Sequence, residues 1–519
     1  MKDLLMLSPI WLSAMTGILV LVIDLLSARK APRGFLGYVT AAGFAATGIA
    51  AVHYWNGSAL EAPFLTGMLA LDGFGAFFAL LILLSGAAAA LFAIDYLPQH
   101  GSDRGEYYAL MAFSVCGALV FLTAVDLITM FLGLEIMSLS VYIMAAMKQS
   151  SARSTEAGMK YFILGGLASA FLLFGIAFLY GATGSLNMVE IGRYFLEHDP
   201  TRDYLFPQVA MILLVAALGF KVAAVPFHMW TPDVYDGAPT PVTVFMAGAV
   251  KAVGFAVLAR LLLTVYQNPA FDEMPVSIPG LLLTLSILTM FVGNILGIVQ
   301  TNVKRILAYS SITHAGYLLL GGYATMGVAG SSGASVLNDG VPFYLLTYVV
   351  STVGAFGIVS LLGSRGEEDM SLDHIAGLGR RHPVLAALML VCVLSLAGVP
   401  PLAGFMGKFF LFREVLAVDP NGNLPWVVIA VLNSFIAAYY YLRIAVYMYF
   451  REPGREPVSA IRGVPGYVCA GIAALLSIWI GLFPARYIAA SQEVSRDSAL
   501  VIATTGDVAR PAASRSGKR

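Results

Sequence analysis

The chain contains fourteen apolar stretches long enough to cross a membrane, and this pattern constrains its fold more than any other feature. The stretches start near residues 8, 35, 70, 106, 127, 158, 207, 240, 279, 304, 341, 384, 424 and 464. A helix needs about 20 apolar residues to cross the hydrocarbon core. Because lipid cannot satisfy unpaired backbone groups, each stretch is predicted to be helical. The pattern predicts an all-α polytopic membrane protein with about fourteen transmembrane helices.

Composition excludes a soluble protein of this length. Of 519 residues, 59% are hydrophobic and 12% are charged, whereas soluble chains typically contain about 25% charged residues. The 30 basic and 30 acidic residues balance, so nucleic acid is excluded as a partner. Cys116, Cys392 and Cys469 lie in separate apolar stretches without a CxxC pair. They are interpreted as packing residues, and no disulfide framework, metal site or cofactor is predicted on this chain.

The distribution of Lys and Arg between alternate loops predicts the orientation. Positive charge is retained on the cytoplasmic side. One set of loops holds fourteen Lys and Arg residues, and the other set, with the N-terminus, holds only Lys2, Arg193, Arg202 and Arg413. Both termini are therefore predicted to be periplasmic in a bacterial inner membrane, with the first span retained. The polar tail, 491–519, is predicted to be disordered, although its basic residues oppose this orientation.

Two of the apolar stretches contain prolines beside a lysine. In the seventh, Lys221 precedes Pro226 and a Pro/Gly-rich run over 230–241; in the twelfth, Gly398-Val399-Pro400-Pro401 precedes Lys408. Proline removes an amide donor and clashes with the preceding turn, so both helices are predicted to be broken. Paired interruptions in the two halves of a transporter indicate an internal repeat and a site between its units.

The paired breaks define the predicted organisation. Residues 1–105 form helices 1–3, 106–268 a first five-helix repeat (helices 4–8) and 278–450 a second (helices 9–13). Residues 463–490 form the last helix, and 491–519 the tail. Five helices per unit is an odd number, so the second repeat is inverted relative to the first.

Ionisable residues within the apolar stretches are the candidates for chemistry. Placing such a side chain in the middle of the membrane costs a few kcal/mol of free energy, so these residues usually face the bundle interior or water. The candidates are Glu135, Lys160, Lys221, His228, Lys251, His314 and Lys408.

Each candidate also has a purely structural interpretation. Glu135 lies roughly 12 Å into its span at 1.5 Å per residue. Its structural interpretation is a protonated carboxyl group that only forms hydrogen bonds. Lys160 is close enough to the cytoplasmic interface for its stem to reach water. Lys221 and Lys251 can form static ion pairs with a carboxylate such as Glu135, and a membrane histidine can be a packed hydrogen-bonding residue.

Lys221 and Lys251 are expected at similar depth, because they lie at comparable distances from a loop centre near Tyr235. Burial and mutual repulsion disfavour two charged ammonium groups, which brings them toward a range where protons are exchanged. Histidine titrates near neutrality and passes protons between neighbours. The remaining intramembrane charges, Asp24, Asp126, Arg260 and Arg443, are interpreted as helix anchors or ion pairs. The cluster Tyr439–Tyr441 is interpreted as interfacial or packing material.

Three motifs together resemble the antiporter-like membrane subunits of respiratory complex I, NADH:quinone oxidoreductase, and especially its N-type (subunit 2) branch. They are KVAAVPFHMWTPDVYDGAPTPVT from Lys221, QTNVKRILAYSSITHAGY from Gln300 and LAGVPPLAGFMGKF from Leu396. Related L- and M-type chains and cation/proton antiporters usually have a WLPDA-type sequence where this chain has Trp230-Thr231-Pro232-Asp233-Val234. The resemblance covers nearly the whole chain.

The resemblance implies a proton-pumping subunit with fourteen helices, two inverted five-helix units and broken helices 7 and 12. It places Glu135, Lys221, Lys251 and Lys408 on the family's proton-transfer positions, and Lys160, His228 and His314 on positions with less defined roles. Other complex I membrane subunits are the implied partners, with FMN, iron–sulfur clusters and quinone on partner chains. Two other functions stay open: a cation/proton antiporter subunit without redox partners, and a structural spacer whose lysines only form ion pairs.

Overall fold

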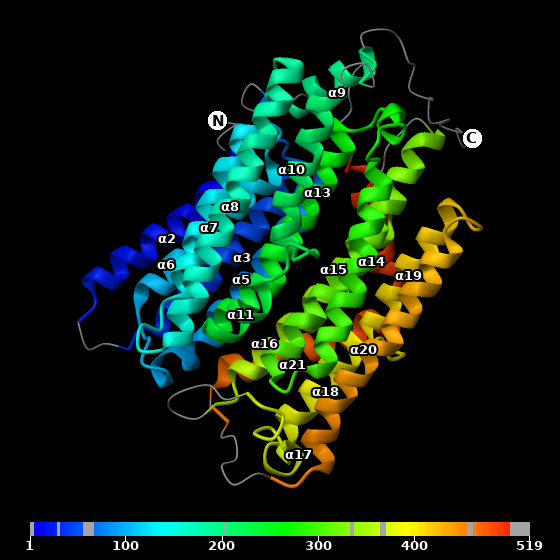
Figure 1. Cartoon of the computed structure of the whole chain (residues 1–519). Helices are drawn as coiled ribbons and strands as arrows, with labels where there is room; N and C mark the ends of the chain where they lie inside the picture. The colour runs from blue at the N-terminus through cyan, green and yellow to red at the C-terminus, as the bar shows by residue number, and fades with distance from the viewer. Residues whose placement is uncertain are drawn as a thin grey trace, which may run out of the picture.

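The computed structural model describes residues 5–28, 32–55, 67–200, 204–332, 337–363, 370–453, 460–461 and 463–498. Within these ranges the chain is helical, with four isolated β-bridges and no strand. Figure 1 shows the N-terminal helices, in blue, on the left of the molecule and helices of the C-terminal half, in yellow and orange, on the right. The prediction of an all-α chain is confirmed.

Twelve helices in the described part of the chain are long and apolar enough to cross a membrane. They are α2 (Ser8–Leu26), α3 (Phe35–Trp55), α5 (Gly73–Gln99), α6 (Gly105–Thr123), α7 (Leu127–Ala145), α8 (Ala152–Thr183), α10 (Leu205–Val222), the segment Thr240–Val265, α14 (Ile278–Val299), α16 (Gly340–Ser360), α20 (Leu424–Phe450) and α21 (Val464–Leu482).

Two predicted spans fall outside this set for physical reasons. Helix α15 (Val303–Ser332) has 30 residues, but serine, threonine and histidine within Ser310–His314, together with the glycines and serines nearer its end, lower its hydropathy. The twelfth stretch is divided into α18 (Pro383–Ala397) and α19 (Ala403–Val418). Neither half is as long as a span that crosses the hydrocarbon core.

Both proline-rich segments interrupt their helices, as the sequence predicts. Helix α10 ends at Val222, and Ala223 is left-handed with φ 62° before α11 (Trp230–Gly237) begins. Helix α18 ends at Ala397, and Gly398 is left-handed with φ 89°. A left-handed residue directly after a helix ends it by turning the chain away from the axis.

The most buried spans lie at the centre of the molecule. These are α16 and the segment Thr240–Val265, which comprises α12 (Thr240–Phe245), the wider turn η1 (Met246–Val250) and α13 (Lys251–Val265). Helix α12 packs against both α5 and α16. This places the lysine at the start of α13 between the N-terminal and C-terminal groups of helices.

Close contact between α6 and α7 fixes the position of the Glu135 helix. A Cβ atom on Gly117 would lie 2.4 Å from the backbone nitrogen of Met137, and one on Gly133 would lie 2.4 Å from that of Phe121. Only glycine permits this approach, which is typical of membrane helix pairs.

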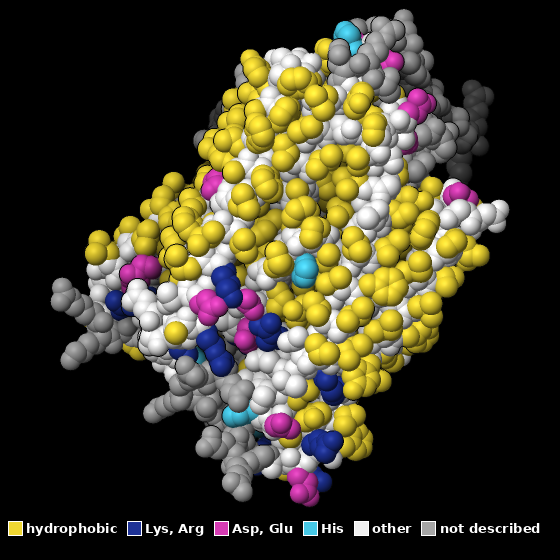
Figure 2. Space-filling view, in the orientation of Figure 1, with side chains coloured by type: hydrophobic (Ala, Val, Ile, Leu, Met, Phe, Trp, Pro, Cys, Tyr) yellow, Lys and Arg dark blue, Asp and Glu magenta, His cyan; other side chains and the backbone are white. Residues whose placement is uncertain are grey.

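Apolar side chains dominate the visible face of the molecule, and the visible Lys and Arg side chains gather in its lower half, where several lie beside Asp or Glu (Figure 2). Such a face suits lipid or another membrane protein rather than water.

Three shorter helices were not predicted: α9 (Met188–Glu197), α17 (Leu378–Arg381) and α22 (Ala485–Arg496). Helix α22 continues past Ser491, so the structure moves the start of the predicted polar tail toward the C-terminus. Residues 499–519 of that tail lie outside the described residues, as do Lys2 and Arg202 of the orientation argument.

Candidate functional site

Lys221 lies in the last turn of α10 with its ammonium group buried. Its Nζ donates to Ser138 Oγ at 2.8 Å and to Tyr142 Oη at 3.4 Å, both on α7. The ring centroids of Tyr142 and Tyr161 are 5.4 and 5.5 Å away. Hydroxyl oxygens and aromatic faces both stabilise a cation removed from water. The side chain is 2% exposed, so the proton of Lys221 is isolated from bulk solvent.

Glu135 lies one turn before Ser138 on α7. Its carboxylate accepts a short hydrogen bond from the hydroxyl of Ser169 on α8, and the residue is half-buried. Residues three apart share a helix face, so Ser138 lies between the carboxylate and Lys221. The Ser138 hydroxyl itself donates to the backbone oxygen of Leu134 at 2.5 Å. Among the described contacts, Glu135 and Lys221 therefore form neither a direct ion pair nor a continuous hydrogen-bonded chain.

Lys251 is the first residue of α13, directly after the wider turn η1. Its Nζ donates to the backbone oxygen of Ser311 at 2.6 Å and also to the Ser311 hydroxyl. That hydroxyl is 2.8 Å from Tyr348 Oη on α16. One turn further along α13, a Cβ on Gly254 would lie 3.6 Å from the Cβ of Lys221. The two lysines therefore lie within about one helical turn in depth, as the sequence predicts.

His314 on α15 is held at both ring nitrogens. Nδ1 is 2.6 Å from Tyr344 Oη, and Nε2 is 3.1 Å from Tyr441 Oη. Tyr441 also makes a short hydrogen bond with Ser310. A hydroxyl both donates and accepts, so either tautomer of the imidazole is satisfied. His314 therefore joins α15, α16 and α20 through groups that exchange protons.

Lys408 lies in the second turn of α19, beside the break. Its Nζ donates to the backbone oxygens of Leu396 and Ala397 at 3.1 and 2.9 Å, and to Ser434 Oγ at 2.8 Å. The last carbonyls of a helix have no partner within the helix. The end of α18 thus supplies oxygen atoms to a lysine that is 5% exposed. The same Nζ is 5.4 Å from the ring centroid of Tyr317.

Gly398→Ala is expected to disturb Lys408 specifically. A Cβ there would lie 3.2 Å from Lys408 Nζ, and the left-handed backbone would cost about 1–2 kcal/mol. We expect proton transport per catalytic turnover to fall about tenfold, because small displacements of a transferring group are costly. The measurement is proton flux in proteoliposomes.

Gly184→Ala is the matched control for this change. Gly184 is also left-handed, with φ 73°, but nothing lies within 4 Å of the added Cβ. Alanine at Gly184 has the same free-energy cost of a left-handed backbone as alanine at Gly398, but its Cβ does not contact Lys408. Equal losses of flux in the two variants would show that backbone strain, and not the position of Lys408, causes the effect.

Lys160 and His228 lie apart from the buried groups. Lys160 Nζ pairs with Glu156 and Asp233, each at 2.7 Å, and its side chain is 40% exposed. Asp233 also pairs with Arg305 at 2.8 Å. His228 lies in the segment between α10 and α11 and is half-buried. The structure brings together Glu135 and Lys221 in one cluster, and Lys251, His314 and Lys408 in a second, but adds neither Lys160 nor His228 to them.

Sequence reasoning missed the hydroxyl groups that hydrogen bond to the charged residues within each cluster. The clearest error concerns Tyr441, which was interpreted as interfacial or packing material but hydrogen bonds to His314. Tyr440 and Tyr441 are buried, whereas Tyr439 is 56% exposed. Ser138 and Tyr142 were detectable in principle, because they follow Glu135 at three and seven residues and share its helix face.

The structural interpretation of the other intramembrane charges is confirmed. Asp24 pairs with Arg33 at 2.5 Å, and Asp126 accepts a hydrogen bond from the backbone of Thr129 at 2.8 Å, capping α7. Arg443 donates to the backbone of Ile298 at 2.8 Å. Arg260 pairs with Asp72 and is discussed below. Among the described residues, no group of three or more His, Cys, Asp or Glu is placed to hold a metal ion.

Two broken membrane helices with a lysine at each break define a protein of the ion-translocating transporter class. The chain belongs to the family described as NADH:quinone oxidoreductase/Mrp antiporter, TM, which matches residues 124–437. The matched region contains all seven candidate residues.

Relatives agree with this family over most of the chain. NADH-quinone oxidoreductase subunit N 1 of Sorangium cellulosum is 46% identical over 81% of this chain and 82% of the relative. Subunit N of Trichlorobacter lovleyi is 40% identical over 85% and 86%. Among solved structures, a chain of respiratory complex I from Thermus thermophilus with bound aureothin matches with a TM-score of 0.75. It is 33% identical and covers 93% of this chain and 98% of that one.

Proposed function

We propose that this chain is the N-type, proton-translocating membrane subunit of an NADH:quinone oxidoreductase. The central observation is the set of three buried lysines, Lys221, Lys251 and Lys408, each hydrogen bonded to hydroxyl or carbonyl oxygens near or between the two broken helices. The names of its relatives support the same assignment. The chain is thus a subunit of a redox enzyme, and the redox chemistry is assigned to other subunits.

Glu135 is the proposed control group for Lys221. A carboxylate near a buried ammonium stabilises the protonated form, and withdrawing that influence favours release of the proton. One pKa unit corresponds to about 1.4 kcal/mol. Moving one charge across 100 mV costs about 2.3 kcal/mol. A change of about two pKa units therefore provides a free energy comparable to the work of moving one proton across a potential of 100 mV.

The proposed path continues from Lys221 to Lys251 and then to the second cluster. Lys251 contacts Ser311, and His314 lies three residues later on α15. Ser311 and His314 are three residues apart on α15 and share one helix face, so Lys251 and His314 border the same interior region. From His314 the path runs past Tyr344, Tyr441 and Tyr317 to Lys408, the proposed exit group. Intervening water completes the contacts between these side chains, with Lys160 and His228 as peripheral members.

The finer topology is also proposed, with fourteen helices counted by adding α15 and the α18–α19 pair to the twelve spans. Residues 1–105 precede two inverted units, 106–268 and 278–450, and 463–490 follow them. The two breaks support this repeat, because Ala223 and Gly398 are both left-handed and a proline follows each after three residues, at Pro226 and Pro401.

The proposed location is a bacterial inner membrane with both termini in the periplasm. The loop charges support this orientation. The proposed partners are the other membrane subunits of the complex, including antiporter-like chains and small membrane subunits. FMN, iron–sulfur clusters and quinone are assigned to partner chains, which supply the energy for transport.

Purification of the native complex through a tag on this chain tests the proposal. We expect NADH:quinone reductase activity to co-purify with the tag, and reconstituted vesicles to acidify only when NADH and quinone are added. Peptide mass spectrometry of the co-migrating chains gives the composition. Sodium/proton or potassium/proton exchange without NADH, in a complex that lacks redox subunits, would instead establish the antiporter alternative.

A further inference from the structure

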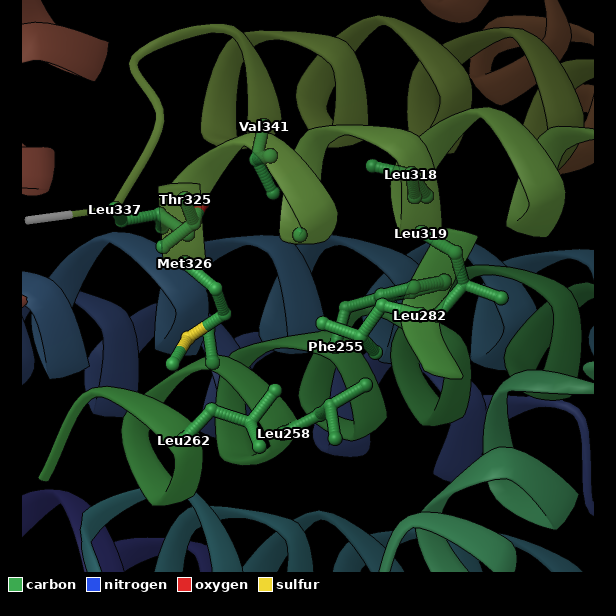
Figure 3. Close-up of a pocket in the computed structure, with 12 residues that line it drawn as sticks. Phe255, Leu258, Leu262, Leu282, Leu318, Leu319, Thr325, Met326, Leu337 and Val341 are labelled. Atoms are coloured by element: carbon green, nitrogen blue, oxygen red, sulfur yellow. The ribbon is translucent and has the colours of Figure 1, made fainter. Parts of the chain in front are cut away.

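An apolar cavity lies between α13, α14, α15 and α16, beyond the Lys251–His314 region (Figure 3). Side chains from all four helices line it, including Phe255 and Leu262 of α13, Leu282 of α14, Leu318 of α15 and Val341 of α16. In Figure 3 these side chains converge on one space. Leu318, Leu282, Leu262 and Phe255 are between 0% and 4% exposed, whereas Ala259 and Gly322 in the same lining are partly exposed. The cavity is therefore largely, but not fully, enclosed.

The cavity has room for a water molecule but offers it no partner. Its volume is about 20 Å³, and a cavity of roughly 10–15 Å³ is sufficient for one water. Thr325 provides the one side-chain hydroxyl in the lining. Its Oγ1 donates to the backbone oxygen of Gly321 at 2.9 Å and accepts from the backbone nitrogen of Asn338 at 3.0 Å. A buried water needs two to four polar partners, so this cavity is expected to be dry.

The position of the cavity relates it directly to the proposed path. Phe255 follows Lys251 by four residues, Leu318 follows His314 by four, and Val341 precedes Tyr344 by three. Each of these spacings corresponds to about one helical turn. Lys251, His314 and Tyr344 therefore each lie about one turn along the same helix from a residue that lines the cavity.

The lining extends from these groups toward one membrane surface. Phe255 and Leu262 lie about 6 and about 16 Å beyond Lys251 along α13, at 1.5 Å per residue. Helix α13 then ends at Val265, and α14 begins at Ile278 on the same side. Under the proposed orientation this is the periplasmic side. The straight route from Lys251 to the periplasm thus crosses apolar side chains.

We propose that this cavity is a dry barrier that prevents protons on Lys251 and His314 from passing straight to the periplasm and so directs them sideways to Lys408. The inference rests on the proposed function. It goes further by assigning a role to apolar residues that exchange no proton. Hydrophobic constrictions exclude ions because water does not fill them, and the same physics applies to a proton that needs a water chain.

Leu318→Asn tests the barrier, with Leu318→Met as the matched control. Asparagine is similar in size to leucine but offers donors and an acceptor to water, whereas methionine keeps the site apolar. The complete complex is reconstituted in vesicles, and a pH gradient is imposed without NADH. We expect the gradient to collapse about tenfold faster with Leu318→Asn than with the unaltered complex, and Leu318→Met to behave like the unaltered complex.

Equal leak rates for Leu318→Asn and the unaltered complex, with equal NADH oxidation, would overturn the barrier. Because the leak is measured without turnover, that outcome leaves the proposed pumping function intact. A high-resolution map of the unaltered complex provides a second measurement if the asparagine variant fails to assemble. Ordered water between Leu318 and Leu262 in that map would refute a dry cavity, and its absence beside resolved water near Lys251 would support one.

Discussion

Alanine in place of Lys221 is expected to lower proton pumping per NADH oxidised by about a hundredfold or more, because a positioned proton-transfer group contributes about 10²–10⁴. Lys221 is buried, and its Nζ contacts Ser138 and Tyr142. No other lysine contacts these hydroxyls in the described hydrogen bonds. The measurement is the initial rate of vesicle acidification divided by the rate of NADH oxidation.

Lys221→Arg separates a proton carrier from a fixed charge. Arginine retains the positive charge but does not release its proton in proteins. A structural spacer needs only the charge, so arginine would preserve its function. A proton carrier would lose pumping with arginine as well as with alanine. Arg413→Ala is the control, because the Arg413 side chain is 54% exposed and pairs with its neighbour Glu414.

Arg260→Leu is expected to have the largest effect on stability. Arg260 Nη2 donates to both carboxylate oxygens of Asp72 at 2.8 and 2.7 Å, and the two side chains are 1% and 3% exposed. Removing one partner of a buried ion pair leaves the other charge without compensation, which costs about 3–5 kcal/mol. We expect the variant chain to be depleted from membranes and the midpoint of thermal inactivation of the complex to fall.

Asp72→Asn in the same chain is expected to recover most of this loss. Asparagine can still accept the hydrogen bond that Asp72 now accepts from the backbone of Gly75 at 2.7 Å, because Asn and Asp are both good N-caps. The double variant therefore removes the unpaired charge without losing the cap of α5. If the double variant is as unstable as Arg260→Leu, packing of the arginine stem rather than its charge holds these helices together.

The helices could largely be predicted from sequence because lipid leaves the backbone few choices. Predicted and observed starts agree within about three residues for most helices, as at 127 for α7 and 424 for α20, whereas α8 begins six residues before its predicted start of 158. The exceptions have local causes. Helix α15 is long but polar at Ser310–His314, and α18 is short because the chain turns at Gly398. The amphipathic helix α9 contains too few apolar residues to be recognised by a search for membrane spans.

The candidate site was only partly predictable. Lysines and a glutamate in apolar stretches are conspicuous because their burial is expensive. Their hydroxyl partners are not, since serine and tyrosine are common in membrane helices and only the packing decides which of them meet. Ser311 reaches Lys251 because α13 lies against α15, and the contact between Tyr441 and His314 depends on the placement of α20.

The double anchoring of His314 has a consequence for the order of events. When a proton arrives from one tyrosine and leaves toward the other, the imidazole need not rotate, but it is left as the opposite tautomer. Before a second proton can follow in the same direction, the ring must rotate so that its two nitrogens exchange places, and the hydrogens of both phenols must turn back. On the proposed path, conduction through His314 is therefore expected to be a sequence of single deliveries separated by resetting, rather than a continuous current.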